Sequence, residues 1–178
     1  AIGQDARALE FAADQLRVHR PTVLKAVQQD GWALEFAASE LQADRDIVLA
    51  AVRSDPQAMQ FASSELCGDR DFLLDAVRAH WECLKYASAD LRGDFGVVLR
   101  AVRQNWQALQ FAAEGLRGKR ELLLEAIRQD GMALKFASEG LRADRGVVAA
   151  AVQRESWALR YAADHLRADS GLLAVAAQ

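Results

Sequence analysis

Proline and cysteine are scarce in this sequence. Two prolines, Pro21 and Pro56, occur in 178 residues, and no Pro- or Ser-rich stretch interrupts the chain. Because Ala and Leu dominate the 52% of hydrophobic residues, we expect an all-helical chain without a flexible linker. The two cysteines, Cys67 and Cys83, have no metal-ligand spacing, so we expect neither a metal site nor a disulfide from them.

Long hydrophobic runs and a strong charge imbalance are also missing. No apolar stretch reaches the roughly 18–20 residues of a transmembrane helix, and no signal peptide is visible. The formal net charge of −3 argues against a basic nucleic-acid arm and against a polybasic membrane surface. These absences predict a protein that is not integral to a membrane.

One unit is instead repeated along the whole sequence. An aromatic residue followed by alanine recurs every 25 residues, at Phe11, Phe36, Phe61, Tyr86, Phe111, Phe136 and Tyr161. Residues that are equivalent in this way form a column. A leucine column contains Leu16, Leu41, Leu66, Leu91, Leu116, Leu141 and Leu166. An alanine column contains Ala26, Ala51, Ala76, Ala101, Ala126, Ala151 and Ala176. Seven copies of one unit are therefore present.

Each unit is expected to form two helices. Apolar residues have helical period from Ala33 to Leu41, and Asp30 precedes them in a column of N-cap residues. Three repeats end this helix with a glycine, where a left-handed residue is expected: Gly68, Gly93 and Gly118. Asp44 then caps a shorter inner helix, "RDIVLAAVR", which is apolar on most sides.

Helix hairpins of this kind stack into an α-solenoid. We predict an all-α fold, a right-handed superhelical stack of seven helix–turn–helix repeats that forms a single domain over residues 1–178. After a partial helix at 1–4, the repeats are 5–29, 30–54, 55–79, 80–104, 105–129, 130–154 and 155–178. Neither end carries a polar capping repeat, so we expect the ends to be continued or covered by partners.

Nothing in the repeats indicates catalysis or metal binding. His19, His80 and His165 fall in three different columns, and no pair has the i, i+4 spacing of metal ligands. Acidic residues recur in equivalent environments, whereas a catalytic pair needs one special environment. The glycines form no phosphate-binding loop. We therefore expect no enzyme activity, no catalytic residue, no cofactor and no metal.

Arginine columns raise the alternative of phosphate binding. The first, second and third arginine rows are Arg17, Arg92, Arg117, Arg142 and Arg167; Arg20, Arg45, Arg70, Arg120 and Arg145; and Arg53, Arg78, Arg103 and Arg128. Regular positive rows could follow an RNA backbone. Local ion pairs and contacts with helix C-termini are favoured, because the second row lies beside the Asp caps and the chain is acidic.

Tryptophans mark the candidate partner-binding surface. Trp32, Met132 and Trp157 share a column that is polar in the other repeats, and Trp81 and Trp106 occupy the column before it. Large side chains at positions that the repeat does not require suggest contact with a partner. Each ring could instead fill a gap against a neighbouring repeat. The two interpretations are equally open for Trp81 and Trp106, while Trp32 and Trp157 favour contact.

The repeat pattern also carries a family resemblance. The segment "ALKFASEGLRADRGVVAAAV" resembles a family of short Leu/Ala-rich helical repeats, about 25 residues long and of unknown function. That family is abundant in protists, notably algae and dinoflagellates, with copies in some bacteria that infect protists. The resemblance covers essentially the whole chain and implies no catalytic residue.

These observations predict a non-enzymatic protein-interaction scaffold, or a structural subunit of a larger assembly. Variable positions on the outer helix would select the protein partners. RNA or phosphate-backbone binding through the arginine rows is an alternative, although the favoured ion pairs argue against nucleic acid. The resemblance implies another alternative, an accessory subunit of a plastid photosynthetic complex such as a photosystem. It would place the chain in the cytoplasm or the plastid, as a soluble or peripheral protein.

Overall fold

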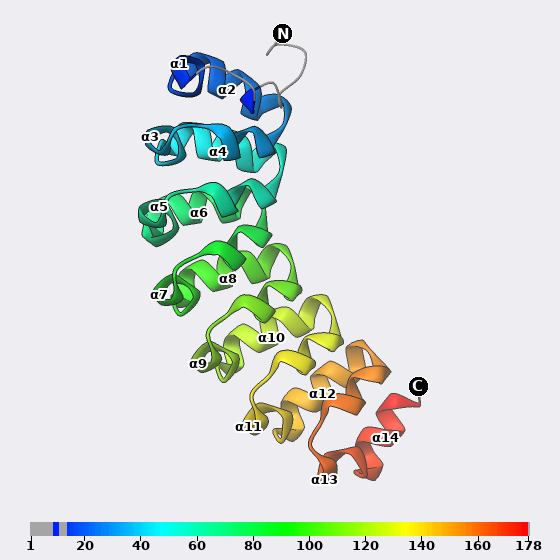
Figure 1. The fold of residues 1–178 in the computed structure, drawn as a ribbon. Coiled ribbons are helices and arrows are strands. Elements are labelled where there is room, and N and C mark those ends of the chain that lie inside the picture. Colours follow the sequence, from blue (N-terminus) through cyan, green and yellow to red (C-terminus); the bar gives the residue numbers. More distant parts are fainter. Residues whose placement is uncertain (1–8, 11–13, 178) are drawn as a thin grey trace. The chain divides into compact units, whose positions relative to one another are not determined.

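Every regular element that the structure describes is a helix. The computed structural model describes residues 9–10 and 14–177, and no strand occurs in these ranges. Contacts between residues divide the chain into two compact units, Ala1–Leu91 and Arg92–Gln178. Within each unit, successive long helices lie side by side in layers (Figure 1). The prediction of an all-α solenoid is confirmed.

The first unit alternates three kinds of helix. A short α-helix is followed by a ten-residue α-helix and then by a six-residue 3₁₀-helix. The elements are α1 (Asp14–Arg17), α2 (Arg20–Gln29), η2 (Gly31–Phe36), α3 (Ser39–Gln42), α4 (Arg45–Ser54), η3 (Pro56–Phe61), α5 (Ser64–Gly68), α6 (Arg70–Ala79), η4 (Trp81–Tyr86) and α7 (Ala89–Arg92). The last of these ends at the first residue of the second unit. Helix α4 packs against both α2 and α6.

The second unit continues the same order of elements. They are α8 (Phe95–Gln104), η5 (Trp106–Phe111), α9 (Glu114–Arg117), α10 (Arg120–Gln129), η6 (Gly131–Phe136), α11 (Glu139–Arg142), α12 (Arg145–Arg154), η7 (Ser156–Tyr161), α13 (Asp164–Arg167) and α14 (Ser170–Ala176). Helix α10 packs against α8 and α12, and α12 packs against α14. Equivalent long helices begin at equivalent positions of the repeat in both units: α4 and α6 at Arg45 and Arg70, α10 and α12 at Arg120 and Arg145.

The first helix of each repeat is broken, whereas the apolar pattern from Ala33 to Leu41 predicts a continuous one. The 3₁₀-helix η2 ends at Phe36, and the next two residues are extended, with φ −73° and ψ 151° at Ala37 and φ −62° and ψ 153° at Ala38. The N–H of Ala38 is not used within a helix and donates to the carbonyl of Arg17 in the preceding repeat at 3.1 Å.

This backbone bond recurs at each joint between neighbouring repeats within a unit. The N–H of the second extended residue donates to a carbonyl near the end of the preceding repeat's short α-helix: Ser63 to Gln42, Ser88 to Cys67, Ala113 to Arg92, Ser138 to Arg117 and Ala163 to Arg142, at 2.9–3.2 Å. A continuous α-helix would use that N–H internally. A hydrogen bond between repeats therefore replaces one within the helix.

The predicted N-caps are largely confirmed. Before the 3₁₀-helices, the Asp30, Asp55, Asn105 and Asp130 side chains accept a backbone N–H, whereas His80 and Glu155 do not. Before the long helices, caps are formed by Asp44, Asp69, Asp94, Asp144 and Asp169. Each such bond satisfies a first-turn donor that the helix itself leaves open.

The glycine prediction is wrong. No described glycine has a positive φ, so Gly68, Gly93 and Gly118 do not form left-handed ends. Gly118 has φ −86° and ψ −3°, and Ala43 at the equivalent position has φ −101° and ψ −1°. The next element starts so soon that the turn stays in the right-handed region, where alanine is as acceptable as glycine.

The core lies along the long helices, as expected for an inner helix. Helix α4 buries Ile47, Val48, Ala51 and Val52 completely. Cys83 is also fully buried, at a small position that alanine occupies in other repeats. Burial raises the pKa of its thiol to about 12. Both cysteines are free thiols. The helices within the described ranges are too short or too polar to cross a bilayer.

Candidate interaction surface

Trp32 lies at a joint between two repeats. Its indole Nε1 donates to the Asp55 carboxylate at 2.9 Å, and its ring packs edge-on against Phe61 with centroids 5.4 Å apart. Both partners belong to the following repeat. The side chain is 36% exposed, so one side of the ring is also open to solvent. Trp32 therefore fills a gap between repeats and still presents part of its surface.

The candidates in the middle of the chain are partly buried. The Trp106 ring lies 5.9 Å from the Phe136 ring of the following repeat, and its backbone N–H donates to Gln129 Oε1 at 2.9 Å. Trp81 and Met132 are half-buried in η4 and η6. The geometry places Trp106 in a joint, as it does Trp32.

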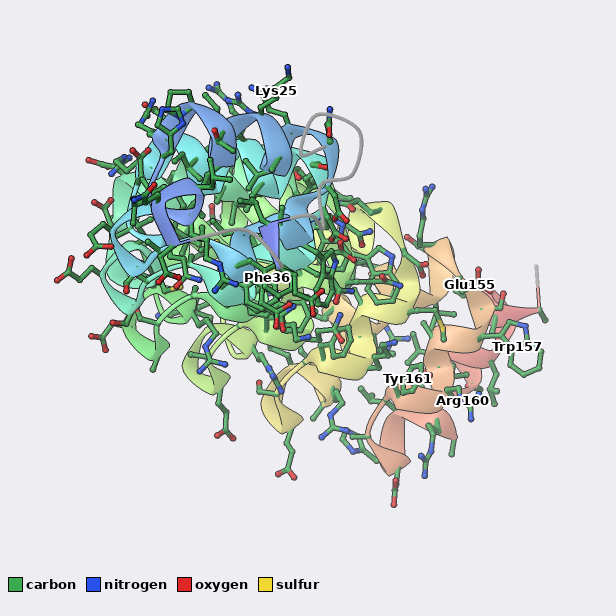
Figure 2. The ribbon with its side chains drawn as sticks, turned by 45° about the horizontal axis from the view of Figure 1, so that its top comes forward. Lys25, Phe36, Glu155, Trp157, Arg160 and Tyr161 are labelled. Carbon is green, nitrogen blue, oxygen red and sulfur yellow. The ribbon has the colours of Figure 1, made fainter. Side chains whose placement is uncertain are left out.

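Trp157 has a different environment. It lies in η7 near the C-terminal end of the second unit and is 72% exposed. Figure 2 shows its indole projecting from the edge of the ribbon. Trp157 is the most open of the five side chains that the sequence singles out as partner-binding candidates.

The second arginine row forms ion pairs between repeats. Each pair joins an arginine to the cap aspartate that opens the long helix of the next repeat: Arg20 to Asp44 at 2.7 Å, Arg45 to Asp69 at 2.9 Å, Arg120 to Asp144 at 3.6 Å and Arg145 to Asp169 at 3.2 Å. The hydrogen bond from Arg20 holds the pKa of Asp44 below its usual range. These four arginines therefore have local carboxylate partners in the following repeat.

The first arginine row contacts the ends of the 3₁₀-helices. Arg17, Arg117 and Arg167 donate to the carbonyls of Glu10, Gln110 and Arg160, each seven residues earlier, at 2.6–3.5 Å. Gln42 occupies this column in the second repeat and donates to the carbonyls of Leu34 and Glu35. These side chains satisfy carbonyls that the short helices leave open.

The third arginine row is exposed, and part of it is paired. Arg103 and Arg128 both approach Glu125, at 3.6 and 2.7 Å, while their own side chains are 62% and 77% exposed. Within the described ranges, all three rows therefore include arginines with local partners, which is the interpretation that the sequence favoured.

A surface of aromatic rings and cations was not anticipated from the sequence. The Phe/Tyr column is half-buried in every described repeat, so the rings keep an exposed side. Lys85 lies over Tyr86 at 5.0 Å, Lys135 over Phe136 at 4.6 Å and Arg160 over Tyr161 at 5.5 Å from the ring centroid. Lys135 also lies 5.1 Å from the Trp106 ring. These distances allow cation–π interaction.

The column before the aromatic residue is the part of the sequence from which this surface could have been predicted. It reads Glu10, Glu35, Gln60, Lys85, Gln110, Lys135 and Arg160, so its charge changes from negative to positive along the chain. A variable column therefore lies beside a constant aromatic one. Charged residues on one helix face are usually only solvated, however, and their contact with the rings becomes visible only in three dimensions.

Two neighbouring grooves in the second unit contain two of these cations, Lys135 and Arg160. Groove A lies between α9 and the η6–α11 segment, with a volume of about 840 Å³, and its lining includes Arg117, Lys135, Phe136 and Arg142. Groove B lies between α11 and the η7–α13 segment, with about 490 Å³, and its lining includes Arg142, Arg160, Tyr161 and Arg167. Arg160 and Tyr161 lie together in Figure 2. The two grooves share Glu139 and Arg142 as a common wall.

No metal-binding site is visible among the described residues. No group of three His, Cys, Asp or Glu side chains comes together there. His19 Nδ1 lies 2.8 Å from the Thr22 hydroxyl at the start of α2, which is a local contact. His165 is exposed in the short helix α13.

A family model for a domain of unknown function, DUF4116, matches this chain five times. The matched segments are 1–42, 19–67, 44–92, 69–117 and 119–167, which together span most of the 178 residues. The expected relationship to a repeat family of unknown function is thereby confirmed. An algal or protist origin and a family unit of about 25 residues stay predictions, because each matched segment covers 42 or 49 residues. No curated protein and no solved structure matches the chain.

Proposed function

The chain belongs to the DUF4116 family, and we propose that it is a non-enzymatic scaffold that binds protein partners along its repeated surface. It acts by presenting its surface residues to partners in a fixed arrangement. Backbone bonds and ion pairs between repeats hold each unit's surface in a fixed arrangement, and variable columns determine which partner binds. The repeats supply positions for recognition, and no chemical step is required of them.

The observation that carries this proposal is the equivalence of groove A and groove B. Their lining residues correspond one to one in successive repeats: Arg117 to Arg142, Lys135 to Arg160, Phe136 to Tyr161 and Glu139 to Asp164. An enzyme needs one special environment. Two adjacent copies of the same environment suit a ligand that itself extends over two repeats, which is a property of polypeptides.

The charges in the grooves define the partner more closely. Each groove has three cationic and two carboxylate side chains in its lining, and in groove B one of the carboxylates, Asp164, is already paired with Arg167 at 2.6 Å. Lys135 and Arg160 lie on aromatic faces and are exposed. A partner segment with acidic side chains and at least one apolar side chain would satisfy both the cations and the rings.

A photo-crosslinking experiment tests the proposal. A benzophenone amino acid at Gly140, which lines groove A and has nothing within 4 Å of its missing Cβ, should crosslink the partner in extracts of the source cells. The double substitution Lys135→Glu and Arg160→Glu should lower partner affinity more than tenfold, because it replaces attraction by repulsion at two sites.

A control variant with the same change of charge shows whether the loss of binding is specific to the grooves or is a general effect of net charge. Arg53→Glu and Lys119→Glu alter two exposed cations outside both grooves and should leave binding within about twofold. Equal loss of binding in both double variants would contradict a role for the grooves. Recovery of RNA in place of protein, with affinity that falls steeply as salt rises, would contradict the choice of partner.

A further inference from the structure

The guanidinium of Arg142 has no partner among the described residues. Elsewhere in the first arginine row, Arg117 donates to the carbonyl of Gln110 at 2.8 Å, and Arg167 donates to that of Arg160 at 3.5 Å. Each acceptor lies seven residues before its donor. Arg142 makes no such bond, and its Nε is shielded from solvent without an acceptor. Because a shielded donor without an acceptor is unfavourable, an acceptor supplied by another molecule would stabilise this side chain.

The carboxylates that lie near Arg142 in the sequence leave it unpaired. In the next repeat, Arg167 binds Asp164, three residues earlier in α13, at 2.6 Å. Glu139 has the equivalent position in α11 and is exposed, but within the described residues no ion pair joins it to Arg142. The cap aspartate that follows, Asp144, is paired with an arginine of the preceding repeat at 3.6 Å. The charge of Arg142 is therefore not neutralised by its own repeat.

A free hydroxyl lies one helical turn before Arg142. The side chain of Ser138 accepts no backbone N–H, whereas Ser63 and Ser88 in the same column each accept one at 3.3 Å. The backbone N–H of Arg142 donates to the Ser138 carbonyl at 3.0 Å, and residues four apart share one face of a helix. Both side chains line groove A. A hydroxyl and a guanidinium on the same face can donate to a single carboxylate.

Arg142 stands between two aromatic rings. It belongs to the common wall of groove A, which contains Phe136, and groove B, which contains Tyr161. Helix α11, which ends at Arg142, lies between α9 and α13 along one edge of the second unit (Figure 1). Both rings are half-buried, so each keeps an exposed side. Arg92 in the same row also has an unsatisfied Nε, but it lines neither groove. A segment that crosses from groove A to groove B meets a ring, a guanidinium and a second ring in that order.

We propose that Arg142 binds one acidic side chain of the partner, and that this acidic residue lies between two apolar residues of the partner segment. The partner carboxylate accepts from the Arg142 guanidinium and the Ser138 hydroxyl, while the apolar side chains pack on Phe136 and Tyr161. A guanidinium holds a carboxylate through two parallel N–H donors, which fixes orientation as well as position. This inference rests on the proposed function and adds the residue that sets the register of the partner across the two grooves.

An NMR titration with synthetic peptides tests this proposal. The probes are capped peptides in which one glutamate lies between two leucines, in a short series that varies the number of glycines on each side of the glutamate. The best peptide should shift the Nε–H signal of Arg142. The same peptide with glutamine in place of glutamate should leave that signal unchanged, because a neutral amide does not supply the paired anionic acceptors.

Substitutions in the first arginine row provide the matched comparison. Arg142→Gln should weaken binding of the glutamate peptide by roughly fivefold or more. Arg92→Gln makes the same change of charge at the same repeat position outside both grooves, and should stay within about twofold. Glutamine suits this column, because Gln42 occupies it and bonds to the carbonyl of Leu34. Arg142→Lys should restore only part of the affinity, since an ammonium cannot make the paired contact.

The remaining outcomes decide against the proposal. Equal weakening by Arg142→Gln and Arg92→Gln, or equal binding of the glutamate and glutamine peptides, would remove the special role of Arg142. If no peptide of the series binds while the crosslinked partner still depends on Lys135 and Arg160, this inference is wrong and the proposed function stands. If that dependence is also absent, both are wrong. Circular dichroism of every variant confirms that its helices are retained.

Discussion

Some single residues in this chain are more tightly restricted by their surroundings than their residue types suggest. Gly31 and Gly131 belong to a column that also contains Pro56, Trp81, Trp106 and Ser156, so the column as a whole does not require glycine. At Gly31, however, an added Cβ would lie 2.5 Å from the carbonyl oxygen of Ala51, at the end of the next long helix. The equivalent contact at Gly131 is with Ala151. At these two positions the 3₁₀-helix and the long helix of the same repeat approach too closely for any side chain.

Gly31→Ala should therefore destabilise the fold. Because the obstructing atom belongs to a helix backbone, the 3₁₀-helix and the long helix have to move apart, and we expect a loss of about 1–3 kcal/mol in the free energy of unfolding. Urea denaturation followed by circular dichroism measures it. Gly140→Ala is the matched control, since its Cβ meets nothing within 4 Å and alanine favours helix α11. A loss of equal size in both variants would contradict the close approach.

At this scale the sequence predicts some features well and others not at all. The caps Asp44 and Asp69 follow from residue type and position, because a short acceptor before a helix has one common use. The turn glycines were interpreted wrongly, because glycine's presence does not reveal its φ. Whether a cation contacts a ring depends on the direction of both side chains, and the sequence of a column does not show that direction.

Among the elements, the ion pairs between an arginine and the next cap aspartate connect neighbouring repeats. In the folded state, hydrogen bonds from Arg20 and Arg145 lower the pKa of Asp44 and Asp169, respectively. The unfolded chain therefore binds protons more readily at these carboxylates. This contribution to stability is fully present above the ordinary aspartate pKa of about 3.9 and is lost as pH falls through the lower pKa of the folded state.

Replacing these cap aspartates by asparagine should show how much of their contribution to stability comes from charge and how much from capping. In the double variant Asp44→Asn and Asp169→Asn, the amide still accepts backbone N–H groups, but the ion pairs are gone. We expect lower stability at pH 7 and a smaller decrease in stability between about pH 5 and pH 2 than in the wild type. Urea titrations at each pH supply the free energies.

A single acid outside these ion pairs provides the control for this prediction. Glu65→Gln alters an exposed carboxylate in helix α5 and should reproduce the wild-type pH profile. If the double asparagine variant keeps the full decrease in acid, other carboxylates control the unfolding, and the ion pairs between repeats have no measurable part in it.

The broken first helix explains why elements were harder to predict than the repeat itself. Leu34, Phe36, Ala37 and Leu41 have a spacing that a continuous α-helix would satisfy. A 3₁₀-helix, two extended residues and a short α-helix also bury Leu34 and Leu41. Hydrophobic period alone cannot separate these two solutions. The carbonyl that decides between them belongs to the preceding repeat, outside the segment whose period is being interpreted.

Across the whole molecule, the strict period predicts tolerance to the loss of a complete repeat. Deleting residues 105–129 joins Gln104 to Asp130, which reproduces the succession of Gln104 and Asn105 and keeps every column in register. The shortened chain should keep the same circular dichroism per residue, with a smaller dependence of stability on denaturant because less surface is buried. Deleting residues 105–116 instead shifts the register and should abolish cooperative unfolding. Equal behaviour of the two deletions would refute the repeat as the folding unit.

The backbone hydrogen bonds between neighbouring repeats affect how the sequences of such chains can diverge. The joints within each unit are closed by a backbone N–H and a backbone carbonyl, as between Ala38 and Arg17, and the donor is alanine in some repeats and serine in others. A bond between main-chain atoms places no demand on side-chain identity. Substitutions in the exposed columns can therefore change the partner of a repeat while its connection to the preceding repeat stays the same. New specificities need not be accompanied by compensating changes in the next repeat.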